Sequence, residues 1–499
     1  MGFLFLLLIP AVAVLFILLG SPTRGTAIVA AVANLGLSLV LAFTWQTNGQ
    51  SLDPYSVPVL SKPLLTFELG LMDGMSVVMM LLSTIVTLAA VLSGKCPEGR
   101  EKLWYSSSLL IATGALGAFL SLDLFFFYAF HELALIPTFL MIGMLGRGDR
   151  KGTAWKVTIY LAFGSIVLLA GLLWLVSETG AKSLLFEDLL AGSIPVEAQA
   201  GIAAFLLVGF GTLISLFPFH SWAAPAYASA PAPVAMLHAG VLKKFGLYGL
   251  LRLYPLVSEG LQEWLVVLIV LLLGNILWVG FVTINQKRLD TMLGNSSVMH
   301  MGYIFLAIAA LIAGGEANEI AIPAAVLLMF AHGISIALLF GLADDIERST
   351  HTLELRELGG LAAKAPTLGF FFGLAGMASI GLPGLANFAG EVMVFLSGFH
   401  DWDPFDPIGP VQIGTVLALW GLVISAVYML RAFRKTFQGP LKPTLEDAPD
   451  LTKSQRLPAI ILAVTLLIVG LYPNSLLRFL NDAPAEPAQA ATEIRSASR

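Results

Sequence analysis

The stretch LISLFPFHSWAAPAYASAPAPVAML, residues 213–237, joins two long apolar segments and interrupts them with prolines. A proline inside a helix removes a backbone N–H donor and clashes with the preceding turn, so this stretch cannot be one unbroken helix. At membrane depth, broken backbone is tolerated only where it is buried in protein or lines a wet cavity. If the flanking segments cross a membrane, the stretch therefore predicts an irregular interior enclosed by protein. The prolines are Pro218, Pro225, Pro231 and Pro233.

Composition indicates that the flanking segments do cross a membrane. Of 499 residues, 57% are hydrophobic and only 12% are charged, and the mean hydropathy is +0.86. A soluble domain carries about 25% charged residues, so lipid must solvate much of this chain. No basic tract interleaved with aromatic residues predicts nucleic-acid binding. The single cysteine, Cys96, lies in a polar loop, so neither a disulfide framework nor a thiolate metal site is expected.

Segments of about 20 mostly apolar residues are long enough to span a bilayer. The first one lacks the basic region of a secretory signal, and we interpret it as a transmembrane helix. We predict an all-α polytopic membrane protein with about fourteen transmembrane helices, followed by a disordered tail at 481–499 that is rich in Ala, Pro and Glu. The spans are predicted near 3–20, 26–45, 72–93, 104–121, 122–146, 155–177, 198–218, 233–254, 262–284, 296–314, 321–343, 366–396, 411–433 and 457–477.

With these fourteen spans, nearly all basic loop residues fall on one side of the membrane. Before the tail, Lys62, Lys182 and Arg252 are the basic residues on one side. The positive-inside rule makes the other loops cytoplasmic and puts both termini on the outer, periplasmic face of a cell inner membrane. The residues of those basic loops are Arg24, Lys95, Arg100, Lys102, Arg147, Arg150, Lys151, Lys287, Arg288, Arg348, Arg356, Lys364, Arg434, Lys435, Lys442, Lys453 and Arg456.

A second interruption, SIGLPGLANFAGE at 379–391, lies in the middle of the twelfth span. The two breaks are five spans apart, an odd number, so corresponding helices run in opposite directions. Such a pattern is typical of an inverted repeat and of a transporter. The predicted organisation is residues 1–100 with spans 1–3, 101–256 as the first repeat with spans 4–8, 257–437 as the second repeat with spans 9–13, and 438–480 with a cytoplasmic loop and the last span.

Few ionisable residues fall within the spans. For Glu132, Lys244 and Glu391 a functional interpretation is favoured, because buried charges of both signs are expensive in a membrane. Asp123 and Lys156 lie near span ends and are equally compatible with capping or snorkelling. Of the neighbours Lys243 and Lys244, which are about 100° apart on a helix, at most one is expected to face the interior squarely. His238, His300 and His332 are the remaining candidates, and the last two are equally compatible with satisfied core histidines.

The chemistry of these side chains fits proton transfer. Buried Glu, Lys and His change charge when a neighbouring charge moves, and His titrates near neutrality without help. Joined by water, they would form a proton wire across the bilayer centre. No competing constellation is present, because the sequence has no Gly-rich phosphate loop, metal-ligand cluster or nucleophile elbow.

At these residues the chain resembles the antiporter-like M-type (chain 4) subunits of respiratory complex I, NADH:quinone oxidoreductase. The resemblance covers nearly the whole chain. It rests on SLDLFFFYAFHELALIPTFLMIG, FPFHSW with APAPVAMLHAGVLKKFGLYGLLR, SSVMHMGYIFLAIA, FAHGISIALLFGL with HTLELRELGGL, and GLPGLANFAGEVMVFL. It implies fourteen helices in two inverted five-helix repeats with helices 7 and 12 broken. It also implies a wire in which Glu132 is the gating carboxylate, Lys244 the central lysine, His300 and His332 the links, and Glu391 the exit.

The chain departs from the family pattern at several positions, of which the one in the seventh span matters most. The lysine expected five residues before Pro218, which would pair with Glu132, is Leu213. His131 stands where a tryptophan is usual, Pro225 and Tyr227 replace an Asp and a His, and Asp290 with Thr291 replaces a Lys–Arg pair. Two explanations compete: His131 supplies a switchable charge near Glu132, or the first half-channel is altered or silent.

The resemblance implies a proton-pumping membrane subunit with N-type and L-type neighbours. Flavin, iron–sulfur clusters and quinone are expected in partner subunits, and no cofactor is expected in this chain. One alternative is a subunit of a multi-chain cation/proton antiporter, a membrane hydrogenase or an inorganic-carbon uptake complex. Another is a structural spacer that pumps nothing, for which Leu213 is the argument.

Overall fold

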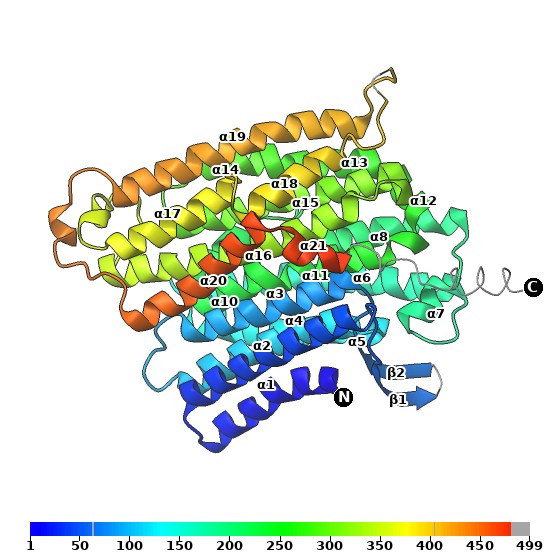
Figure 1. Cartoon of the computed structure of the whole chain (residues 1–499), viewed down its shortest axis with the longest axis horizontal. Coiled ribbons are helices and arrows are strands. Elements are labelled where there is room, and N and C mark those ends of the chain that lie inside the picture. Colours follow the sequence, from blue (N-terminus) through cyan, green and yellow to red (C-terminus); the bar gives the residue numbers. More distant parts are fainter. Residues whose placement is uncertain (62–63, 404, 481–499) are drawn as a thin grey trace, which may run out of the picture.

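The chain folds into a bundle of long helices that lie side by side with roughly parallel axes (Figure 1). The computed structural model describes residues 1–61, 64–403 and 405–480, so the predicted tail at 481–499 and Lys62 lie outside the described residues. Among the described residues, thirteen helices are long and apolar enough to cross a membrane. Two shorter apolar helices, α17 (Pro366–Ile380) and α18 (Ala386–Ser397), together supply a fourteenth. The predicted all-α polytopic fold with about fourteen spans is confirmed.

The long helices are of two kinds. Most are continuous: α1 (Gly2–Leu19), α2 (Thr23–Thr47), α3 (Gly74–Leu92), α4 (Glu101–Leu120), α5 (Leu124–Leu145), α6 (Arg150–Thr179), α8 (Val196–Ile214), α15 (Leu289–Gly314), α16 (Ala321–Thr350), α19 (Pro410–Phe437) and α20 (Lys453–Leu471). Two contain a wider π-helical turn: α10 (Ala232–Leu237), η1 (His238–Leu242) and α11 (Lys244–Leu253) form one, and α13 (Leu265–Leu273), η3 (Gly274–Val279) and α14 (Gly280–Ile284) form the other.

Short elements connect these helices. They are β1 (Tyr55–Ser61), β2 (Leu64–Leu69), α7 (Phe186–Leu190), α9 (Ala223–Ser229), η2 (Tyr254–Leu256), α12 (Ser258–Glu263), η4 (Gly315–Ala317), η5 (Leu361–Ala363), η6 (Pro443–Leu445) and α21 (Asn474–Leu480).

Both predicted helix breaks are present. α8 ends at Ile214, where Ser215 adopts a left-handed conformation with φ 72°, and the chain resumes as α9 at Ala223. α17 ends at Ile380, where Gly381 has φ 79°, and α18 begins at Ala386. Each break therefore combines a left-handed residue with the proline that follows in the sequence. The inverted relation between 101–256 and 257–437 stays a prediction.

The antiparallel hairpin β1–β2 was not predicted by the sequence analysis. Its second strand is fastened to the connection between α4 and α5, where Leu69 forms a bridge with Ser121. The ring of Phe67 lies edge-on against Phe126 of α5 at a centroid distance of 4.8 Å. Most side chains of β1 are exposed, so the alternation of burial that reveals a strand in a sequence is missing.

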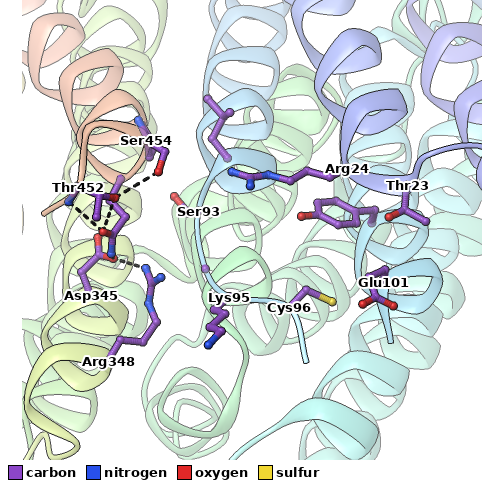
Figure 2. A pocket seen from close by; sticks show the side chains of 15 residues that line it. Thr23, Arg24, Ser93, Lys95, Cys96, Glu101, Asp345, Arg348, Thr452 and Ser454 are labelled. Carbon is purple, nitrogen blue, oxygen red and sulfur yellow. Dashed lines mark hydrogen bonds and ion pairs between the residues drawn. The ribbon is translucent and has the colours of Figure 1, made fainter. Parts of the chain in front are cut away.

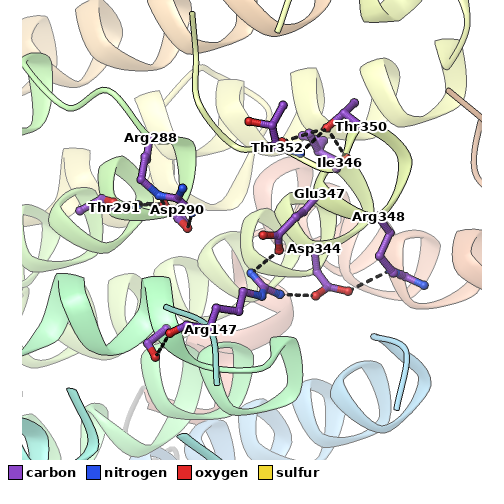
Figure 3. A network of polar contacts seen from close by, with 11 residues as sticks. Arg147, Arg288, Asp290, Thr291, Asp344, Ile346, Glu347, Arg348, Thr350 and Thr352 are labelled. Atoms are coloured by element: carbon purple, nitrogen blue, oxygen red, sulfur yellow. Dashed lines mark hydrogen bonds and ion pairs between the residues drawn. The ribbon is translucent and has the colours of Figure 1, made fainter. Parts of the chain in front are cut away.

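The basic loops meet at the opposite end of the bundle from the hairpin. Arg147, in the loop after α5, forms ion pairs with Asp344 at 2.5 Å and Glu347 at 2.6 Å, both at the end of α16 (Figure 3). Arg348 pairs with Asp344 on the same helix at 3.0 Å. Asp290, which departs from the family pattern, is neutralised locally by Arg288 at 2.7 Å. The network ties the first half of the chain to the second at this end.

The outside of the bundle is apolar on several helices. Phe43 of α2 is 70% exposed, Ile166 of α6 is 68% exposed and Trp420 of α19 is 63% exposed. Large apolar side chains are exposed in this number only where lipid or another protein covers them. Of the predicted wire, Lys244, His300, His332 and Glu391 lie inside this shell, whereas the side chain of Glu132 is partly exposed.

Candidate functional site

The first part of the site lies on α5. Asp123 is fully buried and caps this helix, since its Oδ1 accepts hydrogen bonds from the amides of Phe125 at 2.8 Å and Phe126 at 3.3 Å. An aspartate in this position satisfies amides that have no partner within the helix. Lys156, the other candidate near a span end, is exposed on α6. Both residues therefore lie apart from the buried line of titratable side chains described below.

Glu132 and His131 point in different directions from α5. Glu132 accepts a short hydrogen bond from the hydroxyl of Ser165 on α6, and its side chain is 36% exposed. His131 is buried, and its Nδ1 lies 3.3 Å from Glu132 Oε1. The imidazole stacks on Phe245 of α11 with a centroid distance of 4.0 Å and an angle of 19°. His131 thus connects the carboxylate to the helix that carries the two lysines.

The break after α8 holds polar groups but no charge. Leu213 is buried, and the neighbouring Thr212 donates its hydroxyl to the carbonyl of Val208 at 2.7 Å. The indole of Trp222 donates to the carbonyl of Thr212 at 3.0 Å. The side chain of Leu213 therefore leaves Glu132 without a cationic partner on this helix.

Asn275 clamps the same break from the second half of the chain. Its Oδ1 accepts from the amide of Phe217 at 2.5 Å, and its Nδ2 donates to the carbonyls of Ser215 at 3.1 Å and Val298 at 2.8 Å. These are backbone groups of the break and of α15. Asn275 is fully buried in the π-helical turn η3, which widens the helix at this point.

The lysine pair is buried as a whole. Lys243 is 2% exposed and Lys244 is 0% exposed, so the expectation that only one of them faces the interior was wrong. The π-helical turn η1 directly precedes the pair. Its wider turn rotates the residues that follow around the helix axis relative to their positions in a regular α-helix. Lys244 Nζ donates to the carbonyl of Ala239 at 2.7 Å. Lys243 Nζ has no hydrogen-bond partner among the described residues and lies 5.6 Å from the centre of the Tyr227 ring.

The second part of the site runs from α16 to α18. His332 lies 3.1 Å from the hydroxyl of Ser297, and its ring stacks on His300 at a centroid distance of 5.3 Å. His300 places Nδ1 2.8 Å from the carbonyl of Ser296 and Nε2 2.9 Å from the carbonyl of Ser379. Because carbonyls only accept, both contacts are hydrogen bonds only when both ring nitrogens carry protons. The geometry therefore fits an imidazolium.

Glu391 completes this part of the site. Its Oε1 lies 4.0 Å from His300 Nε2, and both side chains are buried. The carboxylate approaches the end of α17 so closely that a Cβ on Gly381 would lie 2.0 Å from Oε2. One turn before Glu391, the fully buried side chain of Asn387 has no hydrogen-bond partner among the described residues. Buried polar atoms of this kind normally bind ordered water.

The helices that carry Lys244 and His332 are in backbone contact. A Cβ on Gly333 would lie 2.6 Å from the carbonyl of Gly240, and a Cβ on Gly240 would lie 2.9 Å from the carbonyl of Gly333. Only glycine permits this approach of η1 to α16. It brings the central lysine and the linking histidine onto facing helices.

A polar cavity of about 460 Å³ opens at the end where the basic loops meet. Arg24, Lys95 and Arg348 lie around it (Figure 2). Asp345 also lines it and accepts hydrogen bonds from Arg348 and from Gln455. A much smaller space of about 10 Å³, lined by Asp345, Gly341 and Ala337 among others, lies further along α16. Both spaces therefore lie along the last turns of α16, at this end of the bundle.

Several residues of the site were missed by the sequence analysis. Ser165, Tyr227, Asn275, Gly381 and Asn387 are uncharged, so a search for ionisable side chains does not find them. Gly381 had been noted only as part of a break, and Tyr227 only as a departure from the family. Asn275 offered the clearest signal, because an amide in the middle of an apolar span needs buried partners.

Potential metal ligands are not clustered in the described part of the chain. Among residues 1–61, 64–403 and 405–480, no group of three or more His, Cys, Asp or Glu side chains lies close enough to hold a metal ion. The buried titratable groups form an extended line rather than a cluster. Such a line can bind and release protons along its length.

The comparisons with known proteins show the family of the chain as a whole. Residues 121–405 match the family described as NADH:quinone oxidoreductase/Mrp antiporter, transmembrane. NAD(P)H-quinone oxidoreductase chain 4 1 of Synechococcus sp. (strain JA-3-3Ab) is 35% identical over 406 residues, which cover 81% of this chain and 76% of the relative. NADH-quinone oxidoreductase subunit M of Rickettsia felis is 31% identical over 421 residues, which cover 84% and 82%.

Solved structures show the same fold. A chain of respiratory complex I from Thermus thermophilus with bound NADH superposes with a TM-score of 0.86 and 27% identity, covering 96% of this chain and 97% of that one. A chain of the Mrp complex from Dietzia sp. DQ12-45-1b superposes with a TM-score of 0.80 and 20% identity, covering 98% of both, and shows the fold alone. The broken helices, the buried line of Glu, Lys and His, and these relatives identify the chain as a member of the NADH:quinone oxidoreductase/Mrp antiporter family of transmembrane subunits.

Proposed function

We propose that this chain is a proton-translocating, antiporter-like membrane subunit of a complex I-type NADH:quinone oxidoreductase. The observation that carries the proposal is the buried line from Lys244 through His332 and His300 to Glu391. Each of these side chains is at most 3% exposed, and the line ends at the break between α17 and α18. Buried ionisable groups that face the interior of a membrane bundle are by default functional. The relatives named as chain 4 and subunit M support the choice of complex.

In this proposal the chain moves protons and leaves the redox chemistry to its partners. N-type and L-type antiporter-like subunits are the neighbours, and flavin, iron–sulfur clusters and quinone belong to other subunits. Protons arrive through the cavity beside Asp345 and bind at Lys244 Nζ. From there they pass by way of the stacked pair His332 and His300 to the carboxylate of Glu391, with water filling the gaps between the side chains. Electron transfer elsewhere in the complex supplies the driving force.

The orientation belongs to the same proposal. The loops that hold Arg24, Lys95 and Arg348 face the cytoplasm, and the hairpin β1–β2 and Met1 face the periplasm. The support is the positive-inside rule together with the meeting of the basic loops at one end of the bundle.

The spacer alternative rests on Leu213, which removes a charge only from the first half of the path. The multi-chain antiporter alternative rests on the Mrp likeness, which extends to the fold alone. Neither explains why Lys244, His332, His300 and Glu391 are all buried, the last three in contact with one another in turn.

Two measurements test the proposal. First, the complex is solubilised gently from its native membrane, and the co-purifying chains are identified by mass spectrometry; NADH-oxidising and quinone-site subunits are expected. Second, proton pumping per electron is measured in proteoliposomes for Lys244→Ala and Glu391→Ala, with the exposed residue changed in Lys182→Ala as the matched control. Pumping is expected to fall in the first two variants and to stay unchanged in the control. Unchanged pumping in both assembled variants would favour the spacer.

A further inference from the structure

The first half of the proton path has a carboxylate but no cation on the helix where its partner would be expected. α8 carries one ionisable side chain, Glu197, in its first turn, far along the helix from the break after Ile214. Glu132 is held instead by the hydroxyl of Ser165 and by His131. A cation that responds to Glu132 must therefore come from another helix.

Lys243 is a buried cation that the second half of the path does not use. Its Nζ is enclosed and has no hydrogen-bond partner among the described residues. Burying an ammonium without a partner is expensive, so the site requires water or the loss of the proton. The neighbouring His238 is in the same situation, because its Nε2 is also buried without a partner in the described part of the chain. Two unsatisfied nitrogens, on residues five positions apart in the same helix, indicate that ordered water binds here.

Lys243 lies on the side of the first repeat. Its ammonium is above the ring of Tyr227 on α9, the helix that continues the break of α8. The hydroxyl of Tyr227 lies 3.4 Å from Nδ1 of His238. Lys244, by contrast, donates to the carbonyl of Ala239. The two ammonium groups thus have different immediate surroundings.

His131 supplies the connection from Glu132 to this cluster. Its ring stacks on Phe245, two residues after Lys243, at a centroid distance of 4.0 Å. Tyr227 joins Lys243 to His238, since its ring lies under the ammonium and its hydroxyl lies 3.4 Å from Nδ1 of His238. One group of contacts, from Glu132 through His131 to Phe245, and a second group around Tyr227 therefore meet at the helix segment that carries Lys243.

We propose that Lys243 is the switchable cation of the first half of the proton path and is coupled to Glu132 through His131 and His238. This inference rests on the proposed function, because it assigns a role within the same path. Tyr227 fixes the position of the ammonium through its ring and that of His238 through its hydroxyl. The first half-channel is accordingly altered in its residues but not silent.

The proton balance of the step is simple. Lys243 Nζ takes up one proton from His238 through the intervening water, and His238 is re-protonated from His131. His131 recovers its proton from the carboxyl group of Glu132, 3.3 Å away, and water re-protonates that carboxylate. Lys243 then releases its proton to the neutral amine of Lys244. Only N–H and O–H bonds form and break, so no oxidant or reductant is involved. Two adjacent ammonium groups repel each other strongly in the protein interior, so charging one favours discharge of the other.

The test uses the intact complex in proteoliposomes and measures protons pumped per electron, with assembly checked on native gels. Lys243→Gln keeps the length and polarity of the side chain but cannot carry the proton, and it is expected to lower the ratio to the level of Lys244→Gln. Lys243→Arg keeps the charge permanently, because arginine is not deprotonated in proteins, and it is expected to lower the ratio as well. Lys182→Gln, at an exposed loop, is the matched control and keeps the full ratio.

The outcomes separate this inference from the proposed function. A normal ratio in Lys243→Gln together with a low ratio in Lys244→Gln overturns the inference alone. Normal ratios in both variants overturn the proposed function. If Lys243→Gln fails to assemble, the Lys243→Arg variant decides. A normal number of protons pumped per electron in that variant contradicts the inference, because the inference requires a side chain at this position that can release its proton. A double variant, Lys243→Gln with Leu213→Lys, is expected to recover pumping, since it returns a cation to α8 beside the break.

Discussion

Glu391 and Gly381 depend on each other at the break between α17 and α18. Gly381 has φ 79°, a conformation that costs an L-residue about 1–2 kcal/mol. The lack of a Cβ at this position also makes room for the carboxylate of Glu391, which then lies 4.0 Å from His300. The glycine thus shapes the backbone and positions the carboxylate at the same time.

Gly381→Ala is expected to displace the carboxylate of Glu391 and to lower proton pumping, because the new methyl group would lie 2.0 Å from Oε2. Gly384→Ala is the matched control: it has a similar φ of 89°, and the nearest atom to its new Cβ is Leu471 Cδ2 at 3.6 Å. Backbone strain should lower the thermal stability of both variants by about 1–2 kcal/mol, while pumping should fall only in Gly381→Ala. Equal pumping in the two variants would contradict the positioning of Glu391 by Gly381.

At the level of elements, the break after α8 is held by the helix that contains η3. An interrupted helix leaves amides and carbonyls without partners, and in a membrane interior these groups are costly. Asn275 satisfies two of them with one side chain and donates also to the carbonyl of Val298 on α15. The clamp also joins the first half of the chain to α15, which carries His300. The geometry of the break and that of the histidine pair are therefore coupled through one amide.

Asn275→Leu is expected to destabilise the subunit strongly. The change leaves the amide of Phe217 and the carbonyl of Ser215 without the partner that Asn275 supplies, and each buried group left in this way costs about 1–3 kcal/mol. Asn285→Leu, on the exposed end of the same helix where the amide bonds only the carbonyl of Phe281, is the control and should change stability little. Thermal unfolding of the purified complex measures both. Asn275→Asp keeps the acceptor for the amide of Phe217, so its thermal stability should lie between those of Asn275→Leu and Asn285→Leu.

On the scale of the whole molecule, the sequence analysis succeeded where the signal was local. Spans follow from apolar runs, and breaks follow from prolines and glycines, so their number and positions were predictable. The hairpin β1–β2 depends on pairing and on packing against Phe126, which no local pattern records. The burial of both lysines depends on the π-helical turn η1, and the link between His131 and Phe245 depends on the contact of two helices. Tertiary contacts of this kind are invisible in one sequence.

The orientation of the whole bundle can be tested by labelling introduced cysteines from one side of the membrane. The natural Cys96 is a poor label, because burial and the carboxylate of Glu101 raise the pKa of its thiol to about 11. At neutral pH it is therefore protonated, and its reaction with maleimide should accelerate only as the pH rises toward that value. The experiment starts from a Cys96→Ala background, which removes this residual signal.

Thr444→Cys and Ser193→Cys place exposed thiols at opposite ends of the bundle, the first at the end with the basic loops and the second at the end with the hairpin. In intact cells, a membrane-impermeant maleimide is expected to label Ser193→Cys directly and Thr444→Cys only after permeabilisation. Inside-out vesicles should give the opposite result, which controls for differences in reactivity between the two sites. Labelling of Thr444→Cys in intact cells would show that the orientation is the opposite of the one proposed. The cavity beside Asp345 would then release protons to the periplasm instead of admitting them from the cytoplasm.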